Sequence, residues 1–171
     1  MREELVDLVD IDDAVIGETT KEEAHRNGYF HRIAAVFVFR ADGKLLLQLR
    51  AKEKNGGLLD HTVGGHVGRG ESYDDAAKRE MKEEIGLECP LQKLGTFYEI
   101  AERSIGARVR HYFFLYEAHV STEEERQIIP DPCEIQALIP MEFQEVIAKA
   151  NREPEKFTVG FLTALNFYVK Y

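Results

Sequence analysis

The stretch GGHVGRGESYDDAAKREMKEEIGL, residues 64–87, decides how the chain folds around its candidate site. It opens on a glycine-spaced loop and continues into a segment rich in carboxylates. Ser72 is a suitable N-cap, apolar residues recur at intervals of four over 77–85, and Gly86 can end a helix in the left-handed conformation. The stretch therefore predicts a loop followed by a helix between Ser72 and Gly86.

On that helix, Glu80, Glu83 and Glu84 are neighbours on one face, where like charges destabilise an isolated helix. A hard divalent cation such as Mg²⁺ would offset the repulsion, because it binds carboxylate oxygens together with water and substrate phosphate. The same run also fits a solvated acidic face that is balanced by basic side chains of the helix: Lys78, Arg79 and Lys82. Spacing alone leaves both interpretations open.

Length and charge limit the class of protein. A chain of 171 residues is long enough for a substantial core and favours one domain over residues 1–171. The net charge of −9, from 31 acidic and 22 basic residues, argues against a general affinity for nucleic acid or an anionic membrane. A small phosphate-bearing ligand is still compatible with this charge, because a bound cation can invert the local field.

Two cysteines, Cys89 and Cys133, form no CxxC pattern and indicate neither a disulfide framework nor a zinc cluster. The acidic N-terminus has no apolar segment typical of a signal peptide, and no run of about 18 apolar residues is present. We therefore expect a cytoplasmic protein.

Outside residues 64–87, patterning predicts an α/β protein with a mixed sheet. Residues 5–20 predict a β-hairpin, 21–28 a short helix or turn, 52–60 a loop and 121–126 a solvated turn. Further strands are expected at 31–40, 44–51, 61–67, 96–102, 109–120 and 134–140, and helices at 142–151 and 157–170.

The defined positions of the opening stretch resemble the Nudix box, G-x5-E-x7-R-E-U-x-E-E-x-G-U, in which U is aliphatic. The match runs from Gly65 through Glu71 and REM (79–81) to Gly86 and Leu87, and covers residues 65–87. This resemblance to the Nudix hydrolase superfamily implies an α/β/α sandwich with a mixed β-sheet. It also implies an enzyme that acts on a diphosphate linked to another moiety.

By the same resemblance, the box holds a divalent ion, Mg²⁺ or Mn²⁺. Glu80 and Glu84 are the implied principal ligands, and Glu83 is a further ligand, either directly or through water. The backbone carbonyl of Gly64 is the other implied ligand. Two more residues are expected to brace the loop against the helix: Glu71 and Arg79.

The implied reaction is hydrolysis at phosphorus. A bound cation neutralises the diphosphate, polarises the phosphorus and lowers the pKa of a water molecule. A carboxylate then orients or deprotonates that water for in-line attack. Within the box, Glu80 and Glu83 are the predicted catalytic residues. The base can also come from elsewhere in the chain, and three carboxylates are candidates: Glu99, Glu102 and Glu134.

A wider similarity, over residues 5–90, is to the branch that contains type I isopentenyl diphosphate isomerase and its hydrolase relatives. The shared features are a hairpin of the type D-x-x-D-x-V-I-G and a GGHV turn that resembles CGHP. The isomerase needs a cysteine where this chain has Gly64, and a Glu-x-Glu pair that would fall near Val109 and His111. We therefore expect a hydrolase on an isomerase-like framework.

Three histidines, His25, His31 and His66, fall where the isomerase places the histidines of its metal site. Three interpretations are open for them: hydrogen bonding at buried or rim positions, contact with a substrate phosphate, or a second metal site that includes His111. Neutral imidazole is a good ligand for transition metals, so metal analysis can test the last interpretation.

The leading hypothesis is an Mg²⁺- or Mn²⁺-dependent pyrophosphohydrolase of a nucleoside diphosphate derivative. The alternatives are an isomerase-like enzyme and a non-catalytic module that senses a nucleotide. We expect a small-molecule substrate, no nucleic acid or membrane partner, and a homodimer as one form of assembly. The loop 51–61 could hold a phosphate through its basic side chains: Arg50 just before it, Lys52 and Lys54.

Overall fold

A computed structural model describes residues 4–52, 56–102 and 108–171 of the chain. Within these residues the strands are β1 (Leu5–Val9), β2 (Val15–Thr20), β3 (His31–Phe39), β4 (Leu45–Arg50), β5 (Leu59–Asp60), β6 (Val63–His66), β7 (Gln92–Glu102), β8 (Arg108–His119) and β9 (Ile135–Met141). The helices are α1 (Lys21–Asn27), α2 (Tyr73–Ile85), α3 (Thr122–Glu125), α4 (Phe143–Arg152) and α5 (Val159–Lys170), with a 3₁₀ turn at Pro154–Lys156.

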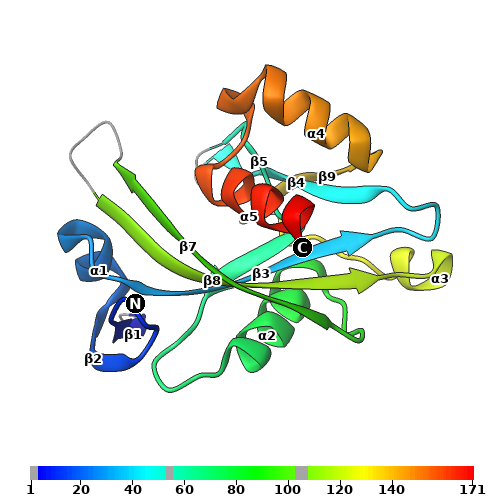
Figure 1. Cartoon of the computed structure of the whole chain (residues 1–171). Helices are drawn as coiled ribbons and strands as arrows, with labels where there is room; N and C mark the ends of the chain where they lie inside the picture. The colour runs from blue at the N-terminus through cyan, green and yellow to red at the C-terminus, as the bar shows by residue number, and fades with distance from the viewer. Residues whose placement is uncertain (1–3, 53–55, 103–107) are drawn as a thin grey trace.

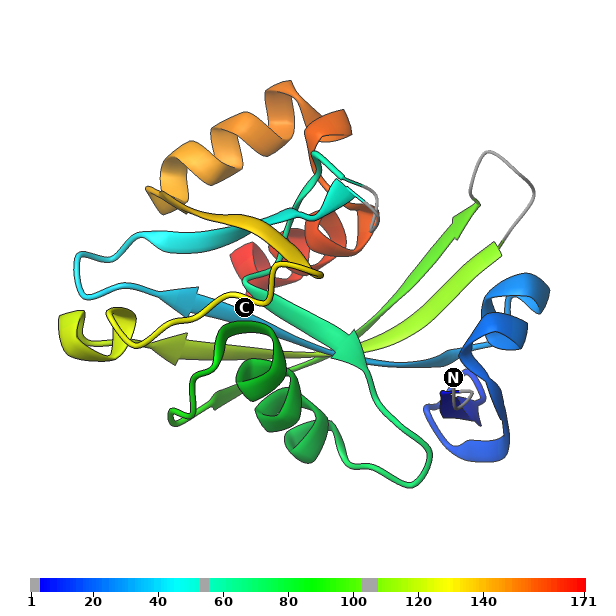
Figure 2. The ribbon, with the colours of Figure 1, turned by 180° about the vertical axis from the view of Figure 1, so that it is seen from behind.

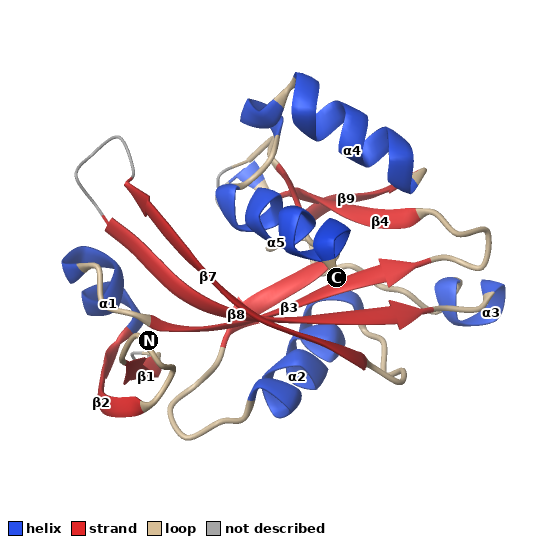
Figure 3. Cartoon of the chain, in the orientation of Figure 1, coloured by secondary structure: helices blue, strands red, loops and turns tan. Residues whose placement is uncertain are grey.

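A mixed sheet forms the centre of the molecule (Figure 3). Its main path runs β5-β4-β3-β8-β7, while β6 pairs with β3 and β9 pairs with β4. Strands β3 and β8 are parallel over nine residue pairs, and the other pairings are antiparallel. The predicted α/β class with a mixed sheet is therefore confirmed.

Helices cover both faces of the sheet, so the core lies in two layers (Figure 1). Helices α4 and α5 pack on one face through residues such as Phe161 and Val146. Helix α2 packs on the other face, where Ala77, Met81 and Ile85 are fully buried as the spacing predicts (Figure 2). This three-layer arrangement fixes the carboxylate face of α2 relative to the strands.

Strands β3 and β4 separate after their hairpin, which opens the sheet beside α2. Their pairing is limited to Phe39 and Leu45, and β6 occupies the position next to β3. Buried Thr62 joins the two strands, because its hydroxyl accepts from Val38 N at 2.9 Å and donates to the carbonyl of Leu46. The chain on either side of Thr62 thus lies inside the opening, and it carries the glycines of the box.

The predicted hairpin at 5–20 is present as the antiparallel pair β1–β2, and it packs beside the start of β3 (Figure 1). Its turn is tied down by Arg32, whose Nε donates to Asp13 at 2.7 Å. Helix α1 follows directly, is capped by Thr20 and ends at Gly28 in the left-handed conformation. This places His25 near the first residue of β3.

Three predicted segments differ from the structure in type or by more than two residues at one end. Strand β7 begins at Gln92 rather than 96, because its N-terminal half pairs with β8 across an irregularity at Gly95. Residues 122–125 form helix α3 instead of a plain turn, since Ser121 and Glu124 make a reciprocal capping box. The predicted loop 52–60 ends in the short strand β5, which pairs with both β4 and, through Leu59, Phe157.

Candidate functional site

A cleft with a volume of about 1060 Å³ lies at the opening between β3 and β4. One side is formed by the box loop and the carboxylate face of α2. Helix α1, the ends of β7 and β8, and the first turn of α5 also contribute side chains to its lining. The cleft therefore combines residues from nearly the whole length of the chain.

Glu84 is the most buried carboxylate of the box, with 6% of its surface exposed. Its oxygens accept hydrogen bonds from Gln48 Nε2 at 2.7 Å and from Gly64 N at 3.3 Å, and both donors are uncharged. Burial, reinforced by the charge of Glu80, raises the pKa of Glu84 to about 8. A cation bound at this position would remove that penalty.

Glu80 lies directly over the glycines of β6. A Cβ atom added to Gly65 would be 2.0 Å from Glu80 Oε1, which is far inside van der Waals contact. Burial raises the pKa of Glu80 in spite of its ion pair with Arg79 at 2.6 Å. The carboxylates of Glu80 and Glu84 are crowded together beside the backbone of Gly65. Their oxygens are the kind of ligand that Mg²⁺ or Mn²⁺ requires.

Arg79 connects the loop to the helix. Its Nε and Nη2 donate to the two oxygens of Glu71 at 2.9 and 3.0 Å, and Nη2 also donates to the carbonyl of His66 at 2.9 Å. Glu71 in turn accepts from Gly68 N at 2.8 Å. Glu83 is more open, with 59% of its side chain exposed and an ion pair to Arg79 at 3.1 Å.

Four histidines from four elements meet in the same cleft. His25 on α1, His31 on β3, His66 on β6 and His111 on β8 each present one ring nitrogen, and these atoms lie within 4.8 Å of one another. The Nε2 of His25 is 3.3 Å from that of His66 and 3.4 Å from that of His111. Tetrahedral coordination with metal–nitrogen bonds of about 2.0–2.1 Å separates ligand nitrogens by about 3.4 Å.

In two of these rings, the nitrogen that points away from the other histidines lies close to a polar group. His31 Nδ1 lies 2.9 Å from the carbonyl of Tyr29, which leaves Nε2 as the inward atom, and this fully buried atom has no partner among the described residues. His111 Nδ1 lies 3.5 Å from Glu99. Burial and the neighbouring His111 lower the pKa of His31 to about 3, and burial also lowers the pKa of His66. Both rings are therefore neutral at neutral pH.

The predicted bases outside the box have different surroundings. Glu134 lines the cleft, and its charge contributes to the raised pKa of Glu84, whose main cause is burial. Glu99 lines the cleft beside His111. The side chain of Glu102 lies outside the described part of the chain, as does Lys54. Arg50, which was expected to help hold a phosphate, forms an ion pair with Asp60 at 2.6 Å. The sequence did not predict this contact.

Sequence patterning missed a buried pair, Asp60 and His61. His61 Nδ1 lies 2.7 Å from Asp60 Oδ1, and the ring lines the cleft. Burial opposes ionisation of Asp60, but the neighbouring His61 and Arg50 outweigh it and keep the pKa of this carboxyl well below its ordinary value. Gln48 was missed as well. An aspartate followed by a histidine at the end of a polar loop carries no spacing signal that could have identified the pair.

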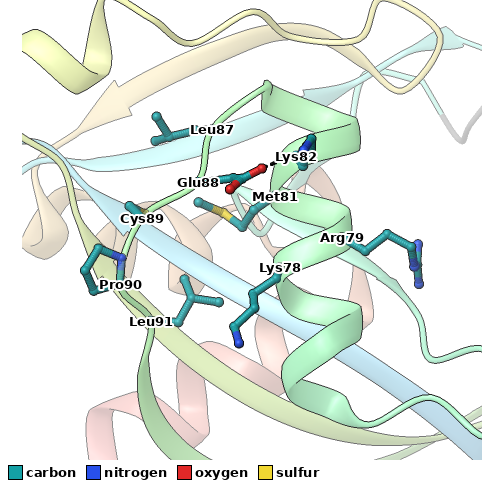
Figure 4. Close-up of a pocket in the computed structure, with 9 residues that line it drawn as sticks. All are labelled: Lys78, Arg79, Met81, Lys82, Leu87, Glu88, Cys89, Pro90 and Leu91. Carbon is teal, nitrogen blue, oxygen red and sulfur yellow. Dashed lines mark hydrogen bonds and ion pairs between the residues drawn. The ribbon is translucent and has the colours of Figure 1, made fainter.

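A second cavity, of about 540 Å³, lies between α2 and the segment that follows it (Figure 4). It is lined by helix residues such as Lys78 and Met81 and by the segment 87–91. Arg79 points away from the other labelled side chains in this view, and the ion pair of Lys82 with Glu88 at 2.6 Å closes one side. Glu80, Glu83 and Glu84 are not part of its lining.

The three-layer fold and the box carboxylates are those of the Nudix class of proteins. Residues 29–160 match the family model described as NUDIX domain, so the chain belongs to this family. It is 35% identical over 167 residues to a protein named isopentenyl-diphosphate Delta-isomerase from Serratia proteamaculans, covering 95% of this chain and 90% of the relative.

Among solved structures, DR0079 from Deinococcus radiodurans superposes with a TM-score of 0.71 at 24% identity, covering 88% of this chain and 90% of that one. A MutT NUDIX hydrolase from Burkholderia pseudomallei superposes with a TM-score of 0.61 at 22% identity, covering 80% and 96%. At these identities the likeness establishes the fold. No helix in the described ranges is long and apolar enough to cross a membrane.

Proposed function

We propose that the chain is a divalent-metal-dependent pyrophosphohydrolase that cleaves the diphosphate linkage of a nucleoside diphosphate derivative. The observation that supports this most strongly is the pair Glu80 and Glu84, two partly or fully buried carboxylates crowded against the backbone of Gly64 and Gly65 in β6. Glu83 and the Gly64 carbonyl are the further proposed ligands. A bound Mg²⁺ or Mn²⁺ would neutralise the diphosphate and make a water molecule more acidic.

The protein groups then have separate roles. Glu71 and Arg79 hold the loop at a fixed distance from α2, and Gln48 orients Glu84 through its amide. Glu80 and Glu83 are the proposed groups that orient or deprotonate the attacking water, which would enter in line with the scissile bond. Glu134 is the alternative base, because it lines the same part of the cleft as Glu84.

A turnover screen tests this proposal. The panel contains nucleoside diphosphate compounds and isopentenyl diphosphate, with Mg²⁺ or Mn²⁺, in ¹⁸O-labelled water. We expect the label in a phosphate product and a loss of turnover of about 100-fold or more in Glu84→Gln, since a metal ligand supplies several kcal/mol. Binding of a nucleotide without turnover would favour the sensing module instead.

The isomerase is the second candidate, because a relative of nearly the same length carries that name. The positions that the isomerase reaction needs argue against it. Gly64 offers no thiol where the isomerase has its cysteine. Val109 and His111, near which the isomerase's Glu-x-Glu pair would fall, carry no carboxylate. Formation of dimethylallyl diphosphate from isopentenyl diphosphate by the wild-type protein would make the isomerase the better assignment.

We also propose that His25, His31 and His66, together with His111, hold a second metal ion rather than a phosphate. Four converging nitrogens at these separations suit a transition metal, and neutral rings bring no positive charge to a phosphate. Elemental analysis of the protein after loading with Zn²⁺ tests this. We expect His66→Ala to lose one equivalent, while the exposed control His119→Ala retains it. Equal metal content in both variants would exclude the site.

A further inference from the structure

The cleft continues beyond the box to the first turn of α5. Its lining there includes His61, Phe113, Thr158 and Gly160, with Glu99 beside them. Pockets of about 300–1,000 Å³ hold drug-sized ligands, so a cleft of about 1060 Å³ has room for much more than a metal-bound diphosphate. We expect the organic group attached to the diphosphate to occupy the remaining volume.

His61 is fixed in one tautomer by the surrounding hydrogen bonds. Asp60 Oδ1 lies 2.7 Å from His61 Nδ1 and also accepts from the hydroxyl of Thr158 at 2.7 Å, while Oδ2 accepts from Arg50 at 2.6 Å. An ionised carboxylate only accepts hydrogen bonds, so the proton must be on Nδ1. In a ring that carries only this proton, the Nε2 atom presents a lone pair.

That Nε2 atom has no hydrogen-bond partner in the described part of the chain, and His61 is only 5% exposed. Its ring is surrounded by Phe37, Phe113 and Phe161, with centroids 5.8 to 5.9 Å away. An unsatisfied polar atom in apolar surroundings is unusual in native proteins and costs about 1–3 kcal/mol. A ligand that donates a hydrogen bond to Nε2 would remove this cost.

The neighbouring groups restrict the ligand further. A Cβ atom added at Gly160 would lie 3.6 Å from His61 Cε1, 3.5 Å from Glu99 Oε2 and 3.1 Å from Phe113 Cζ. The imidazole, the carboxylate and the phenyl ring thus converge on one backbone position. Two hydrogen-bond acceptors beside an apolar ring favour an unsaturated or ring-shaped group with N–H or O–H donors, and disfavour an anionic group.

We propose that the His61 end of the cleft binds the organic group attached to the diphosphate, and that His61 Nε2 accepts a hydrogen bond from an N–H or O–H of that group. The inference rests on the proposed hydrolase function and specifies its substrate class. A nucleoside has such donors, whereas an isopentenyl chain has none. A site built to accept a hydrogen bond discriminates against an analogue that cannot donate one.

The experiment compares three compounds in wild-type protein and His61→Leu with Mg²⁺. They are the best substrate among ADP, GDP, CDP and UDP, together with isopentenyl diphosphate and inorganic pyrophosphate, which are assayed as competitors of that substrate. We expect His61→Leu to raise the KM of the nucleotide by about 5- to 150-fold, as loss of one buried hydrogen bond implies. The inhibition constant of pyrophosphate stays the same, and that of isopentenyl diphosphate stays the same or falls.

Two further variants complete the test. Gly160→Ala narrows the same end of the cleft at a helical position, where the added Cβ would lie 3.1 Å from Phe113 Cζ, and we expect a higher nucleotide KM with pyrophosphate inhibition unchanged. His119→Leu removes an exposed histidine that also pairs with a carboxylate, Glu117, and we expect no effect. His61→Gln retains an acceptor oxygen, so part of the nucleotide affinity should return.

The outcomes separate this inference from the hydrolase function. Nucleotide turnover with an unchanged KM in both His61→Leu and Gly160→Ala would overturn the inference alone. An equal loss of affinity for pyrophosphate and nucleotide would overturn it too, because His61 would then support the diphosphate site. If no nucleotide is turned over while isopentenyl diphosphate binds tightly, both the inference and the proposed function are wrong.

Discussion

The backbone of Gly65 lies against the carboxylate of Glu80, so closely that a methyl group at position 65 would be 2.0 Å from Oε1. This relationship explains why strand β6 contains a glycine at that position. Any side chain there would push Glu80 away from the place where it faces Glu84. The proposed metal site therefore depends on a residue that contributes no side-chain ligand.

Gly65→Ala should weaken divalent-metal binding and reduce turnover by about 100-fold, because a displacement of about 1 Å at a catalytic group has an effect of this size. Titration with Mn²⁺ followed by paramagnetic relaxation measures the affinity. Gly17→Ala is the matched control, since its added Cβ would lie 4.0 Å from Leu8 Cδ1, the one neighbour within that distance among the described residues. Unchanged Mn²⁺ affinity in Gly65→Ala would show that Glu80 does not bind the metal.

Glu84→Gln should change how stability depends on pH in the metal-free protein. Burial and the charge of Glu80 raise the pKa of Glu84 to about 8, so the folded state retains a proton that the unfolded state loses near its ordinary value. The folded state binds more protons in this window, and the free energy of unfolding falls as pH rises from about 4.5 to 8.

Urea denaturation in EDTA at several pH values measures this slope. We expect Glu84→Gln to be flatter than wild type across the window, with the remaining slope coming from groups such as Glu80, whose pKa is also raised. Mg²⁺ should stabilise the wild type most at the high-pH end, where Glu84 is ionised. Parallel curves for the two proteins would show that Glu84 titrates normally.

Arg79→Lys should destabilise the protein although it keeps the charge. Lysine cannot reproduce the two-pronged contact with Glu71 or the additional bond to the carbonyl of His66. Because Arg79 is partly exposed, we expect a loss of about 1 kcal/mol, or about 2–4 °C in melting temperature. Arg126→Lys, in an exposed pair with Glu123, should change stability by less than about 0.5 kcal/mol.

Thr62→Val should reduce stability by about 1–3 kcal/mol, because it leaves Val38 N and the carbonyl of Leu46 without their side-chain partner inside the opened sheet. Chemical denaturation measures the loss. The control is Thr163→Val, since this hydroxyl donates to the carbonyl of Val159 within its own exposed helix turn. Equal effects of the two substitutions would mean that Thr62 does not hold β3 and β4 together.

Gly64→Cys should fold but should not create an isomerase. A Cβ atom at this position meets His61 Nδ1 at 3.5 Å and the carbonyl of Ala34 at 3.7 Å, which are ordinary contacts. Val109 and His111 still provide no carboxylate for proton transfer. Incubation with isopentenyl diphosphate in D₂O, followed by NMR, measures the reaction. Deuterium incorporation by the variant would show that the thiol alone is sufficient.

Local sequence determined the elements and the content of the box. The interval between Ala77 and Ile85 placed one face of α2 in the core, and helical spacing put Glu80 and Glu84 at the edge of that face. Both depend on helical periodicity over a few turns, which involves only neighbours along the chain. The same holds for the hairpin at 5–20 and for the caps Ser72 and Gly86.

Only the tertiary structure decided which distant residues share the cleft. His111 joins His25 because β3 and β8 pair in parallel with His31 opposite His111, a register that no local pattern encodes. The contact of Asp60 with Thr158 similarly depends on how the C-terminal helix packs along β5. Long-range packing sets these separations. The box depends on local spacing and could be predicted from sequence, whereas the surroundings of His61 could not.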